Sequence, residues 1–209
     1  MSIALWDLQK QLLLARQRLP WMHEKVDRGL EAWRYRCPGE AAAGDTYHHA
    51  HRSADGNNWL CAAVPGVDGL RVYTMMWWQR KGRVDALQVV PVGRAFHFYG
   101  HLFSQYRARL TKTRDVITNL HQFFRYNHQL KVMHLGYKHN GRWAVAGVVP
   151  QGLVLGAVNG PHLISCKTYI PREQLNRRKA ALHDMLLAHP GDQLPPSHSA
   201  DLQGLHDAY

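Results

Sequence analysis

The stretch that decides the fold runs from residue 94 to residue 127 and reads RAFHFYGHLFSQYRARLTKTRDVITNLHQFFRYN. Apolar residues in its first half recur at spacings of three and four, which predicts a helix with one buried stripe. The residues of that stripe are Leu102, Phe103, Tyr106 and Leu110. A second amphipathic helix is expected to begin near Thr113, which could cap it, and Asp115 is favourable in its first turn.

A polar row lies beside the apolar stripe of the first predicted helix. His101, Gln105 and Arg109 are four residues apart and therefore share one helical face. His97 adds one more turn to the row if the helix begins that early. An imidazole, an amide and a guanidinium in line provide a proton-transfer group, a hydrogen-bonding group and a phosphate ligand. The row is therefore the first candidate site.

The composition is that of a globular chain. It has 209 residues, 45% of them hydrophobic and 20% charged, which suits one domain with a substantial core. No apolar run is long enough to span a bilayer. The N-terminal segment is interrupted by Asp7, Lys10 and Arg16 and has no small-residue cleavage site, so it predicts a helix and not a signal peptide. Three cysteines without a CxxC spacing favour a reducing, cytoplasmic setting.

The placement of charge is more informative than the formal net charge of +11. Between Ala86 and Arg172 there are eleven lysines and arginines and one acid, Asp115, which gives +10 in less than half of the chain. A concentrated positive field attracts phosphate polymers. The alternative is a basic protein that binds no polyanion; we favour nucleic-acid binding.

The scarcity of carboxylates in this segment argues against two kinds of chemistry. Metal sites built from carboxylates and glycosidase sites built from paired carboxylates both need Asp or Glu. Chemistry here must use His, Arg, Lys, Tyr or hydroxyl groups. Elsewhere, His48, His49 and His51 fall in a predicted loop over residues 38–57. They suit zinc only with a further ligand from another part of the chain, so no metal site and no cofactor is predicted.

The remaining segments predict strands flanked by helices. Residues 3–36 predict two helices that separate at Pro20, and a last helix is expected over residues 172–188. Short β-rich segments bounded by Gly, Pro and Asn predict antiparallel strands. These segments are residues 59–64, 70–78, 84–92, 130–138, 143–149, 153–157 and 162–170.

These elements predict an α+β fold, an antiparallel β-sheet with helices packed on one face and an N-terminal helical arm. The predicted organisation is an arm over residues 1–37, a core domain over residues 38–190 and a tail over residues 191–209. The arm is expected to pack on the core domain, and the alternative is a hairpin that binds a partner.

The central helix carries the pattern H-x-x-x-x-Y-x-x-R, formed by His101, Tyr106 and Arg109. The last predicted strand carries Lys167, Thr168 and Tyr169. Over roughly residues 95–175 the arrangement resembles uncharacterised bacterial domains that are similar to the metal-free ribonuclease toxins of the RelE and colicin type. The first arginine of that family's pattern is Gln105 in this chain, which weakens a catalytic assignment. The resemblance implies cleavage of RNA without a metal, and an antitoxin or other protein partner.

In such a reaction the 2′-hydroxyl of RNA attacks the phosphorus, a base removes its proton and an acid protonates the leaving 5′ oxygen. The resemblance implies that His101 is the base or acid, that Arg109 and Lys167 hold the phosphate, and that Tyr106 stacks on a base or donates a proton. The predicted nucleic-acid-binding residues are Arg107, Arg125, Lys131, Arg142 and Tyr169.

Three functions follow from the sequence. The first is a metal-independent endoribonuclease that acts through a basic cleft. The second is a non-catalytic nucleic-acid-binding or accessory protein that uses the same basic face. The third is a protein-interaction module that uses the N-terminal helices.

Overall fold

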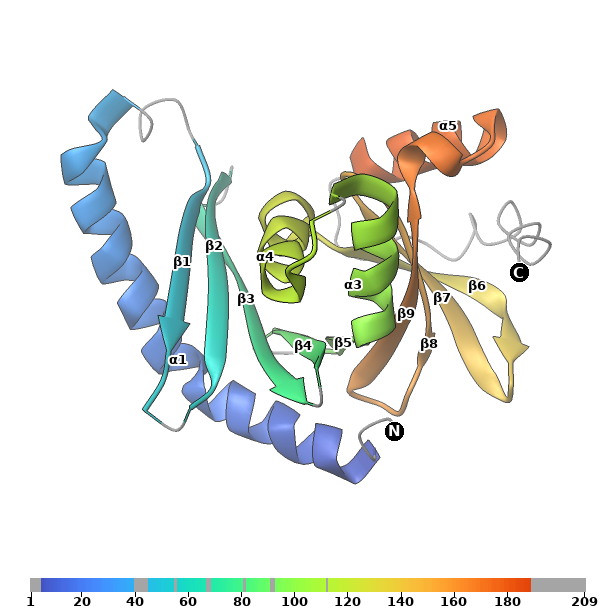
Figure 1. Cartoon of the computed structure of the whole chain (residues 1–209), viewed down its shortest axis with the longest axis horizontal. Coiled ribbons are helices and arrows are strands. Elements are labelled where there is room, and N and C mark those ends of the chain that lie inside the picture. Colours follow the sequence, from blue (N-terminus) through green and yellow to red (C-terminus); the bar gives the residue numbers. More distant parts are fainter. Residues whose placement is uncertain are drawn as a thin grey trace.

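Figure 1 shows a computed structural model of the chain, which describes residues 5–39, 45–54, 56–66, 69–80, 82–90, 93–111 and 113–188. The first half of the fold is one long helix followed by five strands. These are α1 (Leu5–Arg36), β1 (Tyr47–Arg52), β2 (Asn58–Gly66), β3 (Gly69–Arg80), β4 (Arg83–Val89) and β5 (Ala95–Phe98).

The second half begins with the central helices and continues as four strands and a last helix. The helical elements at its start are α3 (Gly100–Tyr106), the π-helical turn η1 (Arg107–Thr111) and α4 (Val116–Asn127). They are followed by β6 (Lys131–His139), β7 (Arg142–Val149), β8 (Gly152–Val158), β9 (Leu163–Pro171), the short turn η2 (Arg172–Gln174) and α5 (Arg177–Ala188). The predicted α+β fold is confirmed.

The nine strands form one sheet in the order β1-β2-β3-β4-β5-β9-β8-β7-β6. Each half of the sheet is an antiparallel meander, and the two meanders meet where β5 runs parallel to β9. Tight turns explain the meanders. For example, Asn140 and Gly141 join β6 to β7 with positive φ angles of 51° and 75°, a conformation that Asn-Gly pairs adopt readily in hairpins. The parallel pair needs a long crossover, which α3, α4 and the strands after them provide.

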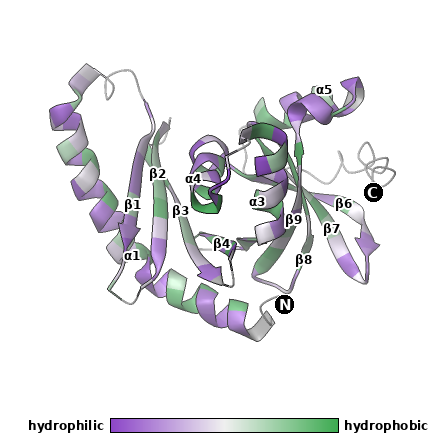
Figure 2. Cartoon of the chain, in the orientation of Figure 1, coloured by the Kyte–Doolittle hydropathy of each residue, from purple (hydrophilic) through white to green (hydrophobic). Residues whose placement is uncertain are grey.

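Helices cover both faces of the sheet, and not one face as predicted, because the N-terminal and C-terminal helices also pack on it (Figure 1). On one face, α3 and α4 bury a core built around Phe98, Phe103, Phe123 and Tyr169. On the other face, α1 packs on the first half of the sheet and α5 packs on part of the second half. Hydrophobic and hydrophilic segments alternate along α1 in Figure 2, as expected of a helix with one face on a core.

The N-terminal helix differs from the prediction in one respect. Residues 5–36 form a single helix with Pro20 inside it, and not two helices. A proline removes one backbone hydrogen bond and crowds the preceding turn, which kinks a helix without always ending it. The ribbon of α1 bends along its length in Figure 1. Its buried residues, among them Leu8, Met22 and Val26, continue one apolar face through the helix, and packing of this face on the sheet holds both parts together.

The predicted loop over residues 38–57 contains a strand. Residues 47–52 form β1 at one edge of the sheet, paired with β2. Because side chains alternate along a strand, the three histidines separate. The rings of His49 and His51 stack 6.1 Å apart, whereas the ring of His48 lies 5.9 Å from that of His128 at the end of α4. The separation removes the three-imidazole cluster on which the metal alternative depended.

The start of the decisive segment was also predicted wrongly. Residues 95–98 form β5, so His97 belongs to a strand and does not extend the helical row. The second central helix begins at Val116, and Asp115 is its N-cap in place of Thr113. The Asp115 carboxylate accepts hydrogen bonds from the backbone N–H groups of Ile117 and Thr118, at 3.3 and 2.8 Å. Aspartate caps helices well because its side-chain oxygens reach these unpaired donors.

The predicted tail over residues 191–209 lies outside the described residues. Among the helices that the structure describes, none combines the length and the apolarity needed to cross a bilayer.

Candidate nucleic-acid interface

The polar row of α3 lies against the edge of β9. The partner strand β5 ends at Phe98, whereas β9 continues to Pro171, so the last part of β9 has no strand on this side. Two side chains of the row take the place of that strand. The backbone N–H of Tyr169 donates to the Gln105 side-chain oxygen at 2.8 Å, and the Arg109 guanidinium donates to the backbone oxygen of Tyr169. The row therefore satisfies a strand edge that would otherwise leave polar backbone groups unpaired.

The same contacts orient His101. Since the Gln105 oxygen accepts from Tyr169, its amide nitrogen points the other way, 3.0 Å from Nε2 of His101. An amide nitrogen can only donate, so Nε2 of His101 accepts and, in the neutral ring, Nδ1 carries the proton. The imidazole is exposed. It can therefore offer an N–H to a phosphate without rearrangement, whereas using Nε2 as a base requires that the bond to Gln105 break.

Tyr106 and Tyr169 lie in the core and not at a surface. Their side chains are 1% and 0% exposed, and their rings are 5.2 Å apart in an edge-to-face arrangement. Tyr106 donates to the side-chain oxygen of Gln151 at 2.8 Å, and Tyr169 donates to the backbone oxygen of Gln151 at 2.6 Å. Burial raises the pKa of Tyr106 to about 12 and also raises the pKa of Tyr169. These positions suit structural support and do not suit base stacking.

Lys167 is the extra residue of a β-bulge. Gly156 of β8 faces Cys166 and Leu155 faces Thr168, so Lys167 has no residue opposite it. The side chain is exposed, and its ammonium lies 5.7 Å from the centre of the Tyr99 ring, a cation–π contact. Bulges re-aim side chains and are frequent next to functional sites.

Lys167 lines a cavity of about 440 Å³, which we name the sheet cavity. Its described lining comes from β6 to β9 and the β6–β7 turn, and it includes Arg142, Ser165 and Thr168 but not His101, Tyr106 or Arg109. The structure thus places the predicted catalytic residues in two regions, His101 and Arg109 on the helical side and Lys167 in the sheet cavity.

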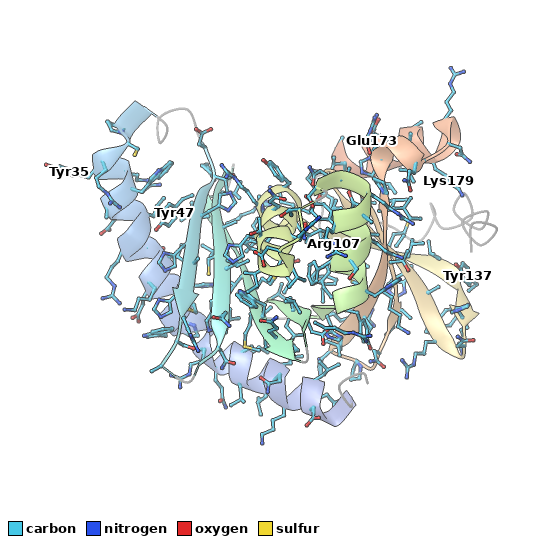
Figure 3. All side chains as sticks on the ribbon, in the orientation of Figure 1. Tyr35, Tyr47, Arg107, Tyr137, Glu173 and Lys179 are labelled. Atoms are coloured by element: carbon cyan, nitrogen blue, oxygen red, sulfur yellow. The ribbon has the colours of Figure 1, made fainter. Side chains whose placement is uncertain are left out.

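Exposed arginines lie near both ends of α4. Arg107 in η1 and Arg114 just before α4 flank the turn between α3 and α4, and Arg125 lies near the other end of α4. Within the described ranges, none of them forms a salt bridge. Asp115 offsets one of these three charges and leaves a balance of about +2. Its carboxylate stays ionised, because the bonds from the side chain and backbone of Thr118 lower its pKa. Figure 3 labels Arg107 beside α3.

The exposed Tyr126 follows Arg125 at the end of α4, and 50% of its surface is accessible. We name Arg107, Arg114, Arg125 and Tyr126 the arginine surface. Part of this surface belongs to η1, and π-helical turns occur frequently at functional sites.

The other predicted binding residues have different surroundings. Lys131 donates to the backbone oxygen of Leu187 in α5, which gives it a structural role. Arg142 is exposed at the border of the sheet cavity. Sequence reasoning missed Arg114 and Tyr126, although both lie in the basic segment, and it missed Ser165, which only the strand register brings into the cavity.

Two histidines outside the row, His97 and His48, have strongly lowered pKa values. His97 is 0% exposed, and its ring contacts those of Trp78 and Tyr99 at centroid distances of 6.2 and 4.3 Å. Burial lowers its pKa to about 4. Burial, followed by the nearby His128 and Arg125, lowers the pKa of His48 to about 4. In the part of the chain that the structure describes, no three His, Cys, Asp or Glu side chains are arranged to hold a metal.

Comparisons of the chain with protein-family models, with curated proteins and with solved structures find no match.

Proposed function

We propose that this protein binds single-stranded RNA through the arginine surface. The observation that carries the proposal is the set of exposed arginines near the two ends of α4, whose only acidic neighbour in the sequence is Asp115. Arginines in this state can form charge-assisted hydrogen bonds with phosphate oxygens, and each such bond releases counterions from the polymer.

A single strand suits this surface better than a duplex. Tyr126 follows Arg125 in α4 and exposes half of its surface, and an exposed aromatic ring can stack on an unpaired base. Bases inside a duplex are already stacked and offer no such face. The Nδ1–H group of His101 adds a donor on the adjacent helix α3.

Cleavage of the bound RNA is the second candidate function, and the exposure of His101 favours it. As general base, His101 would take the proton of the 2′-hydroxyl while the 2′ oxygen bonds to phosphorus, the bond from phosphorus to the 5′ oxygen breaks, and a water molecule gives the 5′ oxygen a proton. The base would have to use Nε2, which accepts from Gln105 in the structure. Binding requires no such change, and for that reason we place it first.

The test measures the anisotropy of a fluorescent single-stranded RNA at several salt concentrations, with EDTA present. We expect binding that weakens with salt. The double variant Arg107→Gln, Arg114→Gln should lower the slope of log K against log salt by about 0.7 for each phosphate that the protein no longer neutralises. The matched control is Arg28→Gln, Arg34→Gln, which removes two exposed arginines of α1 and should leave the slope unchanged.

Equal slopes for the two double variants would contradict the proposal, and so would the absence of RNA binding at low salt. Gel analysis of the same samples tests cleavage. Loss of intact RNA that disappears in His101→Ala would support the second candidate, and intact RNA in all samples would remove it.

A further inference from the structure

The sheet cavity lies on the face of β6 to β9 opposite α3 and α4. On this face Leu186 of α5 packs against Met133 and Leu153. The cavity lies over another part of the same strands. Its volume of about 440 Å³ falls within the range of about 300–1,000 Å³ that is usual for small-molecule sites. Figure 3 labels Tyr137, one of its lining residues, on the β6 side of the molecule, away from Arg107.

The lining of the cavity combines an apolar floor with a cationic border. Leu135, Leu155 and Ala157 contribute the floor, and Arg142 and Lys167 contribute two positive charges. Its described lining contains no aspartate or glutamate. The site therefore has an uncompensated charge of about +2 beside apolar surface, which suits an anion that carries an apolar body.

The bulge in β9 is what builds the cationic side of the site. Regular alternation would place Lys167 and Thr168 on opposite faces of the sheet. Because of the extra residue, both line the cavity, whereas Cys166 and Tyr169 on either side of them enter the core beneath α3 and α4. Gly156 makes the bulge possible, because a Cβ atom at this position would collide with the backbone oxygen of Ser165.

Two hydroxyl groups complete the set of donors. Ser165 is 1% exposed, and its oxygen accepts a hydrogen bond from the Asn159 side chain at 3.2 Å, which leaves its own O–H to donate. Thr168 offers a second hydroxyl. A carboxylate has only two oxygens and can be satisfied by one arginine. A phosphate monoester offers three charged oxygens and can accept from an arginine, a lysine and a hydroxyl together.

We propose that the sheet cavity binds a nucleoside monophosphate. Arg142, Lys167 and the Ser165 or Thr168 hydroxyl hold the phosphate, and the base lies on the apolar floor. The amide of Asn140, also in the lining, can pair with a polar edge of the base. This site is distinct from the arginine surface and does not depend on RNA binding there.

The test is calorimetric titration of the full chain with adenosine 5′-monophosphate, with inorganic phosphate and with adenosine. We expect the monophosphate to bind, and each of the two fragments to bind at least about tenfold more weakly because each fills half of the site. Arg142→Gln and Lys167→Met should each weaken binding of the monophosphate by about tenfold or more. Arg142 is exposed next to a turn, so its variant is expected to fold normally.

Lys138→Met is the matched control. Lys138 belongs to the β6–β7 hairpin, as Arg142 does, and like Lys167 it has a cation–π partner, the Trp143 ring at 5.0 Å, but it does not line the cavity. The affinity of the Lys138→Met variant for the monophosphate should equal that of the unmodified chain. The proposal is overturned if the monophosphate does not bind, if inorganic phosphate binds equally well, or if Lys138→Met weakens binding as much as Arg142→Gln.

Discussion

Polar and basic side chains lie on two sides of β9, in the helical row of His101, Gln105 and Arg109 and at the bulge around Lys167. In the row they bond to the strand, whereas at the bulge they face a cavity. On the α3 side, Gln105 and Arg109 bond to the backbone of Tyr169. On the sheet side, the bulge leaves Lys167 and Thr168 facing a cavity. Polar side chains at suggestive spacings can therefore be engaged in support of the fold, and a change in strand register can turn ordinary ones toward a ligand.

Neighbouring residues of the central segment also have different roles, one in the core and one at the surface. Tyr106 holds the core together through Gln151, while Arg107, the next residue, is exposed.

The largest effect is expected from Tyr106→Ala. Removing this buried ring should lower the free energy of unfolding by about 3–5 kcal/mol, as for other large aromatic residues in cores. His101→Ala, on the exposed side of the same helix, should change it by less than about 0.5 kcal/mol. Urea unfolding measures both. Equal effects would show that Tyr106 does not have the supporting role assigned to it.

The second prediction concerns His97, in the strand that joins the two regions. Its folded pKa of about 4 lies below the unfolded value, so the unfolded chain binds more protons in acid. The neutral His97 therefore contributes about 3 kcal/mol to the free energy of unfolding. This contribution is fully present above about pH 6.5 and is lost as the pH decreases toward 4. Between pH 7 and pH 5, the free energy of unfolding of His97→Phe should therefore decrease by about 2 kcal/mol less than that of the unmodified chain. An identical loss in both would rule out a neutral, buried His97.

The third prediction tests the bulge. Gly156→Ala introduces a Cβ atom against the backbone of Ser165, and it should destabilise the fold by about 1–3 kcal/mol through overpacking. Gly160→Ala is a useful comparison because a Cβ atom there meets no atom within 4 Å, although its φ of 97° adds strain of its own. Thermal unfolding of both variants measures the difference. A fully stable Gly156→Ala protein would contradict the close strand approach at the bulge.

The smallest effect is expected at the strand edge. Gln105→Met keeps the length of the side chain but leaves the N–H of Tyr169 without its acceptor, which should cost about 1–2 kcal/mol. Gln105→Glu keeps an acceptor and should cost less. Amide hydrogen exchange at Tyr169 reports the bond directly. Unchanged protection in Gln105→Met would show that the row does not complete the edge of β9.

Much of the second half of the fold could be predicted from the sequence, because the predicted strands from residue 130 to 170 are bounded by Gly, Pro and Asn. Two strands were missed for physical reasons. β5 has only four residues and continues into a helical pattern, and β1 is rich in histidine, which favours no single element. Pro20 was predicted to end a helix that packing on the sheet keeps intact.

The helical row at His101, Gln105 and Arg109 was correctly placed on one face, but its bonds to β9 depend on where β5 ends, which no local pattern indicates. The bulge at Lys167 likewise arises from the pairing of two strands and not from either one.

The most direct test of the account compares the salt dependence of RNA binding in two double variants, one in each region. Arg107→Gln, Arg114→Gln alters the arginine surface, and Arg142→Gln, Lys167→Gln alters the sheet cavity. We predict that the first pair lowers the slope of log K against log salt by about 1.4, at about 0.7 per phosphate, and that the second leaves it unchanged. A lower slope in the second pair alone, or the same slope in both, would contradict RNA binding at the arginine surface.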